Sequence, residues 1–276
     1  MIPFTKMHGL GNDCVIIDAR SDPVLLSEDS IRLIADRRHG VGCDQLVMLE
    51  PPKNGNADVF LRFYNSDGSE AGACGNATRC IASRLMQAQR TDRITLQTAA
   101  GLLSAHIDGR GMVAVDMGEA RLGWRDIPLS HDMDTLTLDL AAGPYSGPAA
   151  VGMGNPHCVF FVADAEAVDL AGLGPKVEHD PLFPQRTNVE FVTVLDRNRV
   201  RMRVWERGAG ITRACGSGAC AVAVAAARRG LTGRSIEVIL DGGSLFIEWR
   251  DDNHVVMGGP VAFVFTGTLD DAVGTA

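Results

Sequence analysis

The chain lacks any extended run of like charge, and none of its apolar stretches approaches the roughly 18 residues that a membrane span needs. Acidic residues outnumber basic ones by 34 to 26, for a formal net charge of −8. This balance argues against nucleic acid or an anionic membrane as a partner. The start, Met1–His8, also lacks the basic region followed by an apolar run that marks a secretory signal. We therefore expect a cytoplasmic protein.

The seven cysteines include no Cys-x-x-Cys pair, and their number is odd. Both facts argue against a disulfide framework or a zinc ribbon, and we expect no metal. In a reducing cytosol the thiols stay free, as catalysis by a thiol requires. Most of the cysteines are expected to be plain core residues, because unpaired cysteine is among the most buried residue types.

Low-complexity tracts are absent as well, but the two halves of the chain carry matching elements in the same order. Chance matches of single motifs would not keep a constant register, so the matches indicate duplication of a unit of about 120–140 residues. An apolar content of 46% is enough for a core in each unit. The pairs lie 143, 143, 141 and 141 residues apart: Gly9–Asn12 with Gly152–Asn155, Asp44–Val47 with Thr187–Glu190, Tyr64–Asn65 with Trp205–Glu206, and Cys74 with Cys215.

Each unit mixes strands and helices. Periodicity predicts helices over residues 29–38, 75–89 and 216–229. The last of these is apolar on every face, which indicates a sheet wrapped around it. Residues 119–149 are rich in Gly, Pro and polar residues and place a domain junction at or just before them. The expected strands include Cys14–Ile17, Val59–Tyr64, Cys158–Val162, Val189–Val194, Val200–Trp205 and a final one, Phe263–Thr266, able to pair in either domain.

Candidate chemistry is concentrated at two Cys-Gly steps, Cys74-Gly75 and Cys215-Gly216, each of which opens a predicted helix of small residues. Free helix N–H groups and the positive end of the helix dipole favour a thiolate at such a position. Two such thiols can act on opposite faces of one carbon, where one removes a proton as a base and the other returns a proton as an acid. The same helix ends form an anion site for a carboxylate on that carbon.

Other interpretations of these cysteines are a buried packing role and a single nucleophilic cysteine with a histidine partner. Neither explains two Cys-Gly helix starts in duplicated register. A further alternative is a redox sensor in which Cys74 and Cys215 form a reversible disulfide. Only a two-base enzyme would move deuterium from D₂O onto a substrate Cα. Cys80 and Cys220, further along the same helices, are expected to be packing residues.

Neutral amides in predicted turns and strand ends form a second group of candidates. Each can donate and accept, so together they suit a zwitterion, although any one alone is a common turn residue. Arg207 can bind a second carboxylate with two hydrogen bonds, or be a solvated charge at a strand end. His157 and Glu206 can tune or relay thiol protonation, or be a loop histidine and a surface carboxylate. The amides are Asn12, Gln45, Asn65, Asn76, Asn155 and Asn188.

Six blocks in order make the chain resemble the diaminopimelate epimerase family along essentially its whole length. The resemblance implies a cofactor-independent epimerase that converts LL-diaminopimelate to the meso form for lysine and peptidoglycan synthesis. By this resemblance the partner is a small-molecule substrate, and two copies form a homodimer. The blocks are Lys6–Asp13, Gly40–Gln45, Asn65–Glu70 with Cys74–Asn76, Gly154–His157, Arg186–Phe191, and Trp205–Gly208 with Ala214–Ala219.

The resemblance also implies an α+β fold of two similar domains, each a mixed sheet rolled into a barrel around a central helix. We place the first domain at residues 1–120, with 264–276 returning to it, and the second at 121–263. Cys74 and Cys215 would be the acid/base pair, and His157 and Glu206 would modulate the thiols. Substrate would be held by Asn12, Gln45, Asn65, Asn155, Asn188, Glu206 and Arg207, with backbone N–H groups of Gly75, Asn76, Gly216 and Ser217 at the reacting carboxylate.

Several positions depart from the usual family pattern. Two rival families match the chain less well than this one. Proline racemase-like enzymes carry histidine after the first Cys-Gly, where this chain has Asn76, and the phenazine-biosynthesis isomerase pattern lacks the two thiols. None of the departures removes a polar group from the expected site, except for a tyrosine hydroxyl at position 205. The departures are Cys14 for an aromatic residue, Cys43 for Ala, Trp205 for Tyr, Ser217 for Thr, and Phe265 for a Tyr at the dimer contact.

Overall fold

The computed structural model describes residues 1–53, 55–72 and 74–270. In it, the second half of the chain repeats the strand order of the first half. Contacts divide the chain into two units: Met1–Val115 with the segment from Gly259 onward, and Asp116–Gly258. We refer to these as unit 1 and unit 2. The predicted return of residues 264–276 to the first domain includes 271–276, which lie outside the described residues.

In unit 1 neighbouring strands follow the order β1–β2–β3–β4–β6–β7–β8, with β5 paired to β4. The pairs β2/β3 and β4/β6 are parallel and the others antiparallel. The strands are β1 (Ile2–Gly9), β2 (Asn12–Asp18), β3 (Gln45–Glu50), β4 (Val59–Asn65), β5 (Glu70–Ala71), β6 (Arg93–Thr98), β7 (Gly101–Ile107) and β8 (Val113–Glu119).

Unit 2 repeats this order as β11–β12–β13–β14–β16–β17–β18, with β15 paired to β14 and with β12/β13 and β14/β16 parallel. The same two parallel steps at the same places confirm the internal duplication. The strands are β9 (Ala141–Ala142), β10 (Tyr145–Ser146), β11 (Ala149–Gly152), β12 (Pro156–Phe161), β13 (Asn188–Asp196), β14 (Arg199–Glu206), β15 (Gly210–Ile211), β16 (Ser235–Leu240), β17 (Gly243–Trp249) and β18 (His254–Gly259).

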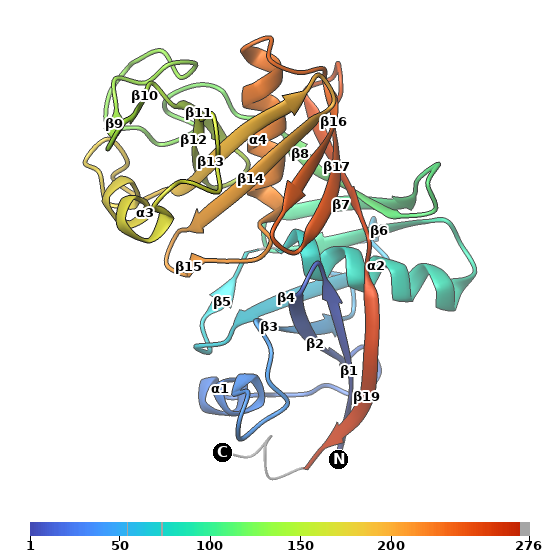
Figure 1. The fold of residues 1–276 in the computed structure, drawn as a ribbon. Coiled ribbons are helices and arrows are strands. Elements are labelled where there is room, and N and C mark those ends of the chain that lie inside the picture. Colours follow the sequence, from blue (N-terminus) through green and yellow to red (C-terminus); the bar gives the residue numbers. More distant parts are fainter. Residues whose placement is uncertain (54, 73, 271–276) are drawn as a thin grey trace. The chain divides into compact units, whose positions relative to one another are not determined.

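Each unit curves its sheet around one helix, as predicted. In unit 1, α2 (Gly75–Gln89) contacts β1, β2, β6 and β7. In unit 2, α4 (Gly216–Arg228) contacts β11 to β14, β16 and β17 (Figure 1). Every residue of α4 from Gly218 to Ala226 is buried, which explains why this helix is apolar on all faces. It ends at Arg228, with Arg229 as its C-cap and Gly230 following at a φ of 67°, so that cations and a glycine terminate the helix.

A second, smaller helix covers the outer side of each core. The helix α1 (Glu28–Ala35) begins at Ser27, whose side chain accepts a hydrogen bond from the Ser30 N–H. Its Ile31 and Ile34 are buried against β2 and β3 residues such as Val15 and Leu46. It is shorter than the predicted 29–38, because the chain turns to extended backbone at Asp36.

Its counterpart α3 (Leu170–Glu178) lies between β12 and β13 in the sequence and was not predicted. Gly172, Gly174 and Pro175 lower its intrinsic helix propensity, so local sequence gives little sign of a helix. Asp169 caps its start by accepting a hydrogen bond from the Gly172 N–H at 3.0 Å. Packing of Leu170 and Val177 into the unit 2 core is what stabilises it.

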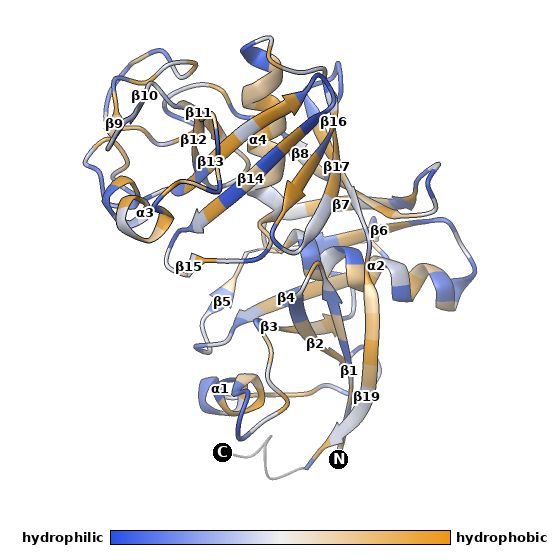
Figure 2. Ribbon diagram, viewed as in Figure 1, coloured by the Kyte–Doolittle hydropathy of each residue, from blue (hydrophilic) through white to orange (hydrophobic). Residues whose placement is uncertain are grey.

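Unit 1 is completed by the last strand, β19 (Ala262–Leu269), which runs antiparallel beside β1 (Figure 1). Strand β14 shows the alternation of a half-buried strand, with arginines at 199, 201 and 203 and buried Val200, Met202 and Val204 between them (Figure 2). Across the described ranges 1–53, 55–72 and 74–270, no helix combines the length and the apolar character that crossing a membrane requires.

Candidate active site

Both predicted cysteines cap the central helix of their unit. Cys74 is the residue before Gly75 at the start of α2, and Cys215 is the residue before Gly216 at the start of α4. Both have extended backbone, with φ values of −145° and −122°. The sequence prediction that each Cys-Gly step opens a helix is therefore confirmed. At these positions the thiols lie next to N–H groups that have no partner within the helix.

Three of the predicted side chains of unit 1, Asn12, Gln45 and Asn65, occupy strand ends. The Cys74 thiol lies 3.9 Å from the Asn12 side-chain oxygen, and Asn12 is the first residue of β2. Gln45, the first residue of β3, pairs with Asn65, the last residue of β4. The Oε1 atom of Gln45 is buried and accepts no hydrogen bond from the residues described. A buried acceptor in this state gains free energy when a ligand donates to it.

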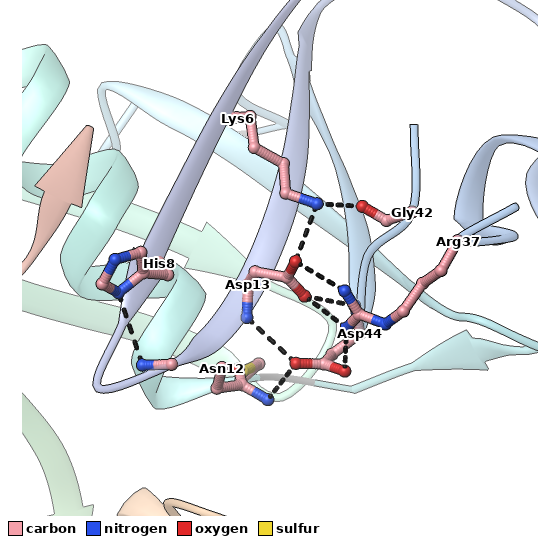
Figure 3. Close-up of polar contacts among 9 residues, drawn as sticks. Lys6, His8, Asn12, Asp13, Arg37, Gly42 and Asp44 are labelled. Atoms are coloured by element: carbon pink, nitrogen blue, oxygen red, sulfur yellow. Dashed lines mark hydrogen bonds and ion pairs between the residues drawn. The ribbon is translucent and has the colours of Figure 1, made fainter. Parts of the chain in front are cut away.

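A network of ion pairs and hydrogen bonds surrounds the start of β2 at Asn12 (Figure 3). The Asp13 N–H donates to the Asp44 carboxylate at 3.0 Å, and the Asp44 N–H donates to the Asp13 carboxylate at 2.9 Å. Arg37 donates to both carboxylates, and the Lys6 ammonium lies 2.7 Å from Asp13. The Asn12 amide donates to Asp44 at 3.4 Å, which leaves its oxygen facing Cys74.

The same network determines the charges of its two acids. Burial opposes ionisation of Asp13, but hydrogen bonds from Arg37 and Lys6 outweigh it and hold the pKa of Asp13 well below its usual range. Burial, together with the charge of Asp13, raises the pKa of Asp44. The sequence analysis did not single out this network, although Lys6, Asp13 and Asp44 all fall in the blocks that carried the family resemblance.

In α2, Asn76 is buried and its side-chain oxygen accepts from Arg79 at 2.9 Å. Arg79 is a fully buried arginine. This contact gives Asn76 a side-chain role in joining the first turns of the helix. Asn76 was predicted both as one of the six amides and as a backbone donor. Its backbone N–H belongs to the group of helix-start donors that includes Gly75.

In unit 2, Cys215 is enclosed more completely, with 4% of its surface exposed. The Gly218 N–H donates to its sulfur at 3.4 Å, and the Ser217 hydroxyl lies 3.7 Å from the sulfur. Burial raises the pKa of the Cys215 thiol well above its ordinary value, and the nearby carboxylates of Glu206 and Glu190 raise it further. The hydrogen bonds from Gly218 and Ser217 oppose this shift without reversing it.

A chain of buried and partly buried polar groups connects Cys215 to Glu190. Asn155 donates to Ser217 at 3.4 Å, and its oxygen lies 2.9 Å from Nε2 of His157. The other ring nitrogen of His157 lies 2.6 Å from Glu190, and neither of these two side chains is exposed. The sequence analysis missed Glu190 as a partner of His157. An acidic residue inside the apolar run Val189–Val192 is the sequence signal that marks it.

Glu206, Arg207 and Asn188 meet at the ends of β13 and β14. Burial raises the pKa of Glu206, although hydrogen bonds from Thr212 and Cys215 oppose this. Asn188 accepts from the Arg207 N–H at 3.0 Å and donates to the Pro156 carbonyl at 2.9 Å, so its amide joins three segments of the unit. The Arg207 guanidinium, on an exposed residue, donates to the Gln185 carbonyl at 3.1 Å.

The charge of Glu206 leads to a prediction for Cys215. Glu206→Gln removes a carboxylate that opposes thiolate formation, so we expect the pKa of Cys215 to fall. More of the thiol is then ionised at a given pH, and the pH midpoint for alkylation of Cys215 by iodoacetamide moves down. Peptide mass spectrometry across pH 6–10 measures that midpoint for each cysteine. The exposed Glu248→Gln serves as the control, and an unchanged or raised midpoint in Glu206→Gln would contradict the effect.

The duplicated positions of the two units carry different chemistry. Asn12 and Asn155, Gln45 and Asn188, Asn65 and Glu206, and Cys74 and Cys215 are equivalent by their places at strand ends and helix caps. Unit 2 has the partly buried acid Glu206 where unit 1 has Asn65, and the fully buried acid Glu190 where unit 1 has Val47. Each unit therefore carries one cluster of polar residues at a helix start that begins with a cysteine, and the surroundings of the two thiols differ.

Comparison with known proteins first defines the class. A solved structure described as a predicted epimerase from Pseudomonas aeruginosa has the same fold, with a TM-score of 0.70 at 20% identity over 98% of this chain and 99% of that one. The two chains therefore share one fold over nearly their whole length.

Sequence comparison defines the family within that class. The family model for diaminopimelate epimerase matches residues 4–123 and 149–264. Diaminopimelate epimerase of Rhodospirillum centenum is 60% identical over 270 residues, covering 98% of this chain and 93% of the relative. The enzyme of Acidiphilium cryptum is 54% identical, covering 98% and 97%. The chain belongs to the diaminopimelate epimerase family.

Proposed function

We propose that this protein is a PLP-independent diaminopimelate epimerase that converts LL-2,6-diaminopimelate to the meso form, with Cys74 and Cys215 as the acid/base pair. The observation that carries the proposal is the pair of cysteine helix caps at duplicated positions, in a chain of this family. Inversion at Cα requires a base on one face of the carbon and an acid on the other. A thiolate and a thiol meet that requirement with no cofactor.

The reaction proceeds by two proton transfers. The thiolate removes the Cα proton, and the thiol gives a proton to the opposite face of the planar carbanion. The roles of the two sulfurs exchange when the reaction runs in reverse. Backbone N–H groups of Gly75, Asn76, Gly216 and Ser217 bind the carboxylate on the reacting carbon and stabilise the negative charge that develops there.

The resting thiol is assigned to Cys215. Its burial and the carboxylates of Glu206 and Glu190 raise its pKa, so it enters the reaction of LL-diaminopimelate as the proton donor. Cys74 then acts as the base. His157 and Glu206 modulate the thiol, since both belong to the polar surroundings of Cys215.

The remaining polar residues hold the substrate. Arg207 suits the carboxylate at the far end of diaminopimelate, because a guanidinium can donate two parallel hydrogen bonds to it. Gln45 offers a buried oxygen for the substrate ammonium group. The other substrate-holding side chains in the proposal are Asn12, Asn65, Asn155, Asn188 and Glu206.

The test is incubation of the purified protein with LL-diaminopimelate in D₂O, with L-proline as the control substrate. The expected result is formation of the meso isomer with deuterium at one Cα, and no exchange on proline. Exchange on proline alone would assign the protein to proline racemase-like chemistry. Absence of exchange on both substrates would favour a redox sensor and overturn the proposal.

We also propose that the protein is a cytoplasmic homodimer serving lysine and peptidoglycan precursor synthesis. Supporting the dimer, β19 exposes a row of apolar side chains: Phe263 at 61%, Val264 at 46% and Phe265 at 43%. A neighbouring apolar surface would remove this row from water. Sedimentation velocity is expected to give twice the chain mass of 29.4 kDa, and Phe265→Glu is expected to shift the protein to monomer. A wild-type protein that sediments as a monomer at micromolar concentration would exclude the dimer.

A further inference from the structure

The last residue of α3, Glu178, is a buried acid in an unfavourable place. Only 3% of it is exposed, and it stands at the helix C-terminus, where the dipole disfavours negative charge. Its nearest cation, Arg186, is 3.8 Å away and 57% exposed, so this ion pair offsets little of the cost. Another set of contacts must therefore account for the carboxylate.

Those contacts are two hydrogen bonds from a single turn. The Trp205 indole N–H donates to one carboxylate oxygen at 2.6 Å, and the Gly208 N–H donates to the other at 2.9 Å. Residues 205 and 208 bracket Glu206 and Arg207, two members of the proposed site. Glu178 therefore accepts hydrogen bonds from the residues on either side of Glu206 and Arg207.

The surrounding packing directs the tryptophan toward Glu178. A Cβ at Gly174, one helical turn before Glu178, would lie 2.5 Å from the Trp205 ring, so the indole rests directly on the helix backbone. Within the turn, the Arg207 N–H donates to the buried Asn188 oxygen at 3.0 Å. The backbone N–H groups of Arg207 and Gly208 are thus both held by buried acceptors, which limits the positions available to the Arg207 side chain.

We propose that Glu178 is a positioning residue for the epimerase reaction, acting through Trp205 and Gly208 to fix the turn that presents Glu206 and Arg207. The inference rests on the function proposed above and adds a residue that touches no substrate. It also accounts for Trp205, which stands where the family commonly has Tyr: here the indole N–H is the donor that Glu178 accepts.

The test is a kinetic comparison of three variants in the full chain. In Glu178→Gln the side-chain amide oxygen can still accept one of the two hydrogen bonds, from Trp205 or from Gly208. The NH₂ group faces the other donor, so that hydrogen bond is lost. We expect kcat/KM for LL-diaminopimelate to fall at least tenfold, with KM rising at least threefold as Arg207 loses its fixed position. Trp205→Phe keeps an aromatic ring but removes the indole N–H, and a three- to fivefold fall in kcat/KM is expected.

The matched control is Val177→Ala. Val177 is the neighbouring buried residue of α3 and its truncation weakens the same packing without touching the carboxylate. This variant is expected to lower the Tm while KM stays within twofold of wild type. The double variant Glu178→Gln/Trp205→Phe is expected to lose less kcat/KM than the product of the two single losses, because both changes act on the same linkage.

Kinetics of Glu178→Gln equal to those of Val177→Ala would overturn the inference, as would losses that multiply in the double variant. If Glu178→Gln fails to fold, Trp205→Phe decides alone, and an unchanged KM and kcat/KM there rejects the role. Each of these outcomes concerns the variants alone and is compatible with an active wild-type epimerase. A wild-type protein inactive on diaminopimelate would instead reject the proposed function.

Discussion

Cys74→Ala and Cys215→Ala are each expected to reduce epimerisation of LL-diaminopimelate by at least about 10³-fold, because either change removes one of the two proton-transfer groups. Each cysteine stands at the N-cap position, where Cys74 makes no side-chain cap hydrogen bond and Cys215 accepts one from the Gly218 N–H. Loss of such a cap costs about 1 kcal/mol and leaves the helix interior unchanged. The expected loss is therefore chemical, with the fold retained. Chiral chromatography of the product measures the rate, and thermal unfolding checks the fold.

The controls for this prediction lie in the same two helices. Cys80 and Cys220 are fully buried and face the interior of their units, so alanine there should cost stability and leave most of the activity. Full epimerase activity in either Cys74→Ala or Cys215→Ala would exclude the two-base assignment.

Gly218→Ala is expected to lower kcat by about 100-fold, because the added methyl group would enter the space around Cys215. An ideal Cβ there lies 2.8 Å from the Glu190 carboxylate, 3.0 Å from Met202 and 3.2 Å from the Cys215 sulfur. Glu190 is held by His157 and cannot move away freely. The sulfur or the helix start has to shift instead, and a displacement near 1 Å costs about this much in rate.

The stability of Gly218→Ala combines opposing effects. Alanine in place of a helical glycine gains about 1 kcal/mol, whereas overpacking costs about 1–3 kcal/mol, so a small net destabilisation is expected. The matched control is Ala77→Gly at the equivalent position of α2, which should cost about 1 kcal/mol and leave kcat within a few-fold of wild type. A Gly218→Ala enzyme with wild-type kcat would show that the thiol does not need this space.

The sequence contained the repeat, and the repeat predicted most of the fold. The constant offset placed Cys74 and Cys215 at equivalent helix caps, and Gln45 and Asn188 at the first residue of equivalent strands. These positions were predictable because strand ends and helix caps have local signals in glycine, asparagine and apolar periodicity.

Features that depend on long-range packing were not predictable in the same way. The helix α3 is poor in helix formers and depends on burial in unit 2, although the 143-residue offset from α1 would have located it. The partnership of His157 and Glu190 joins residues 33 positions apart, and only the parallel pairing of β12 with β13 brings them together. The direction of the Trp205 ring depends on the absence of a side chain at Gly174, which no local pattern reveals.

The pairing of β1 with β19 sets the order in which the two units can fold during synthesis. Unit 2 is built from one continuous segment, residues 116–258, and all of its strands are translated before β19. Unit 1 begins with β1, the first strand to be translated, and is completed only by β19, the last. Until β19 is available, the edge of β1 that pairs with it is uncovered. That exposed edge is open to pairing with other nascent chains, which makes the interval before β19 arrives the stage most vulnerable to aggregation.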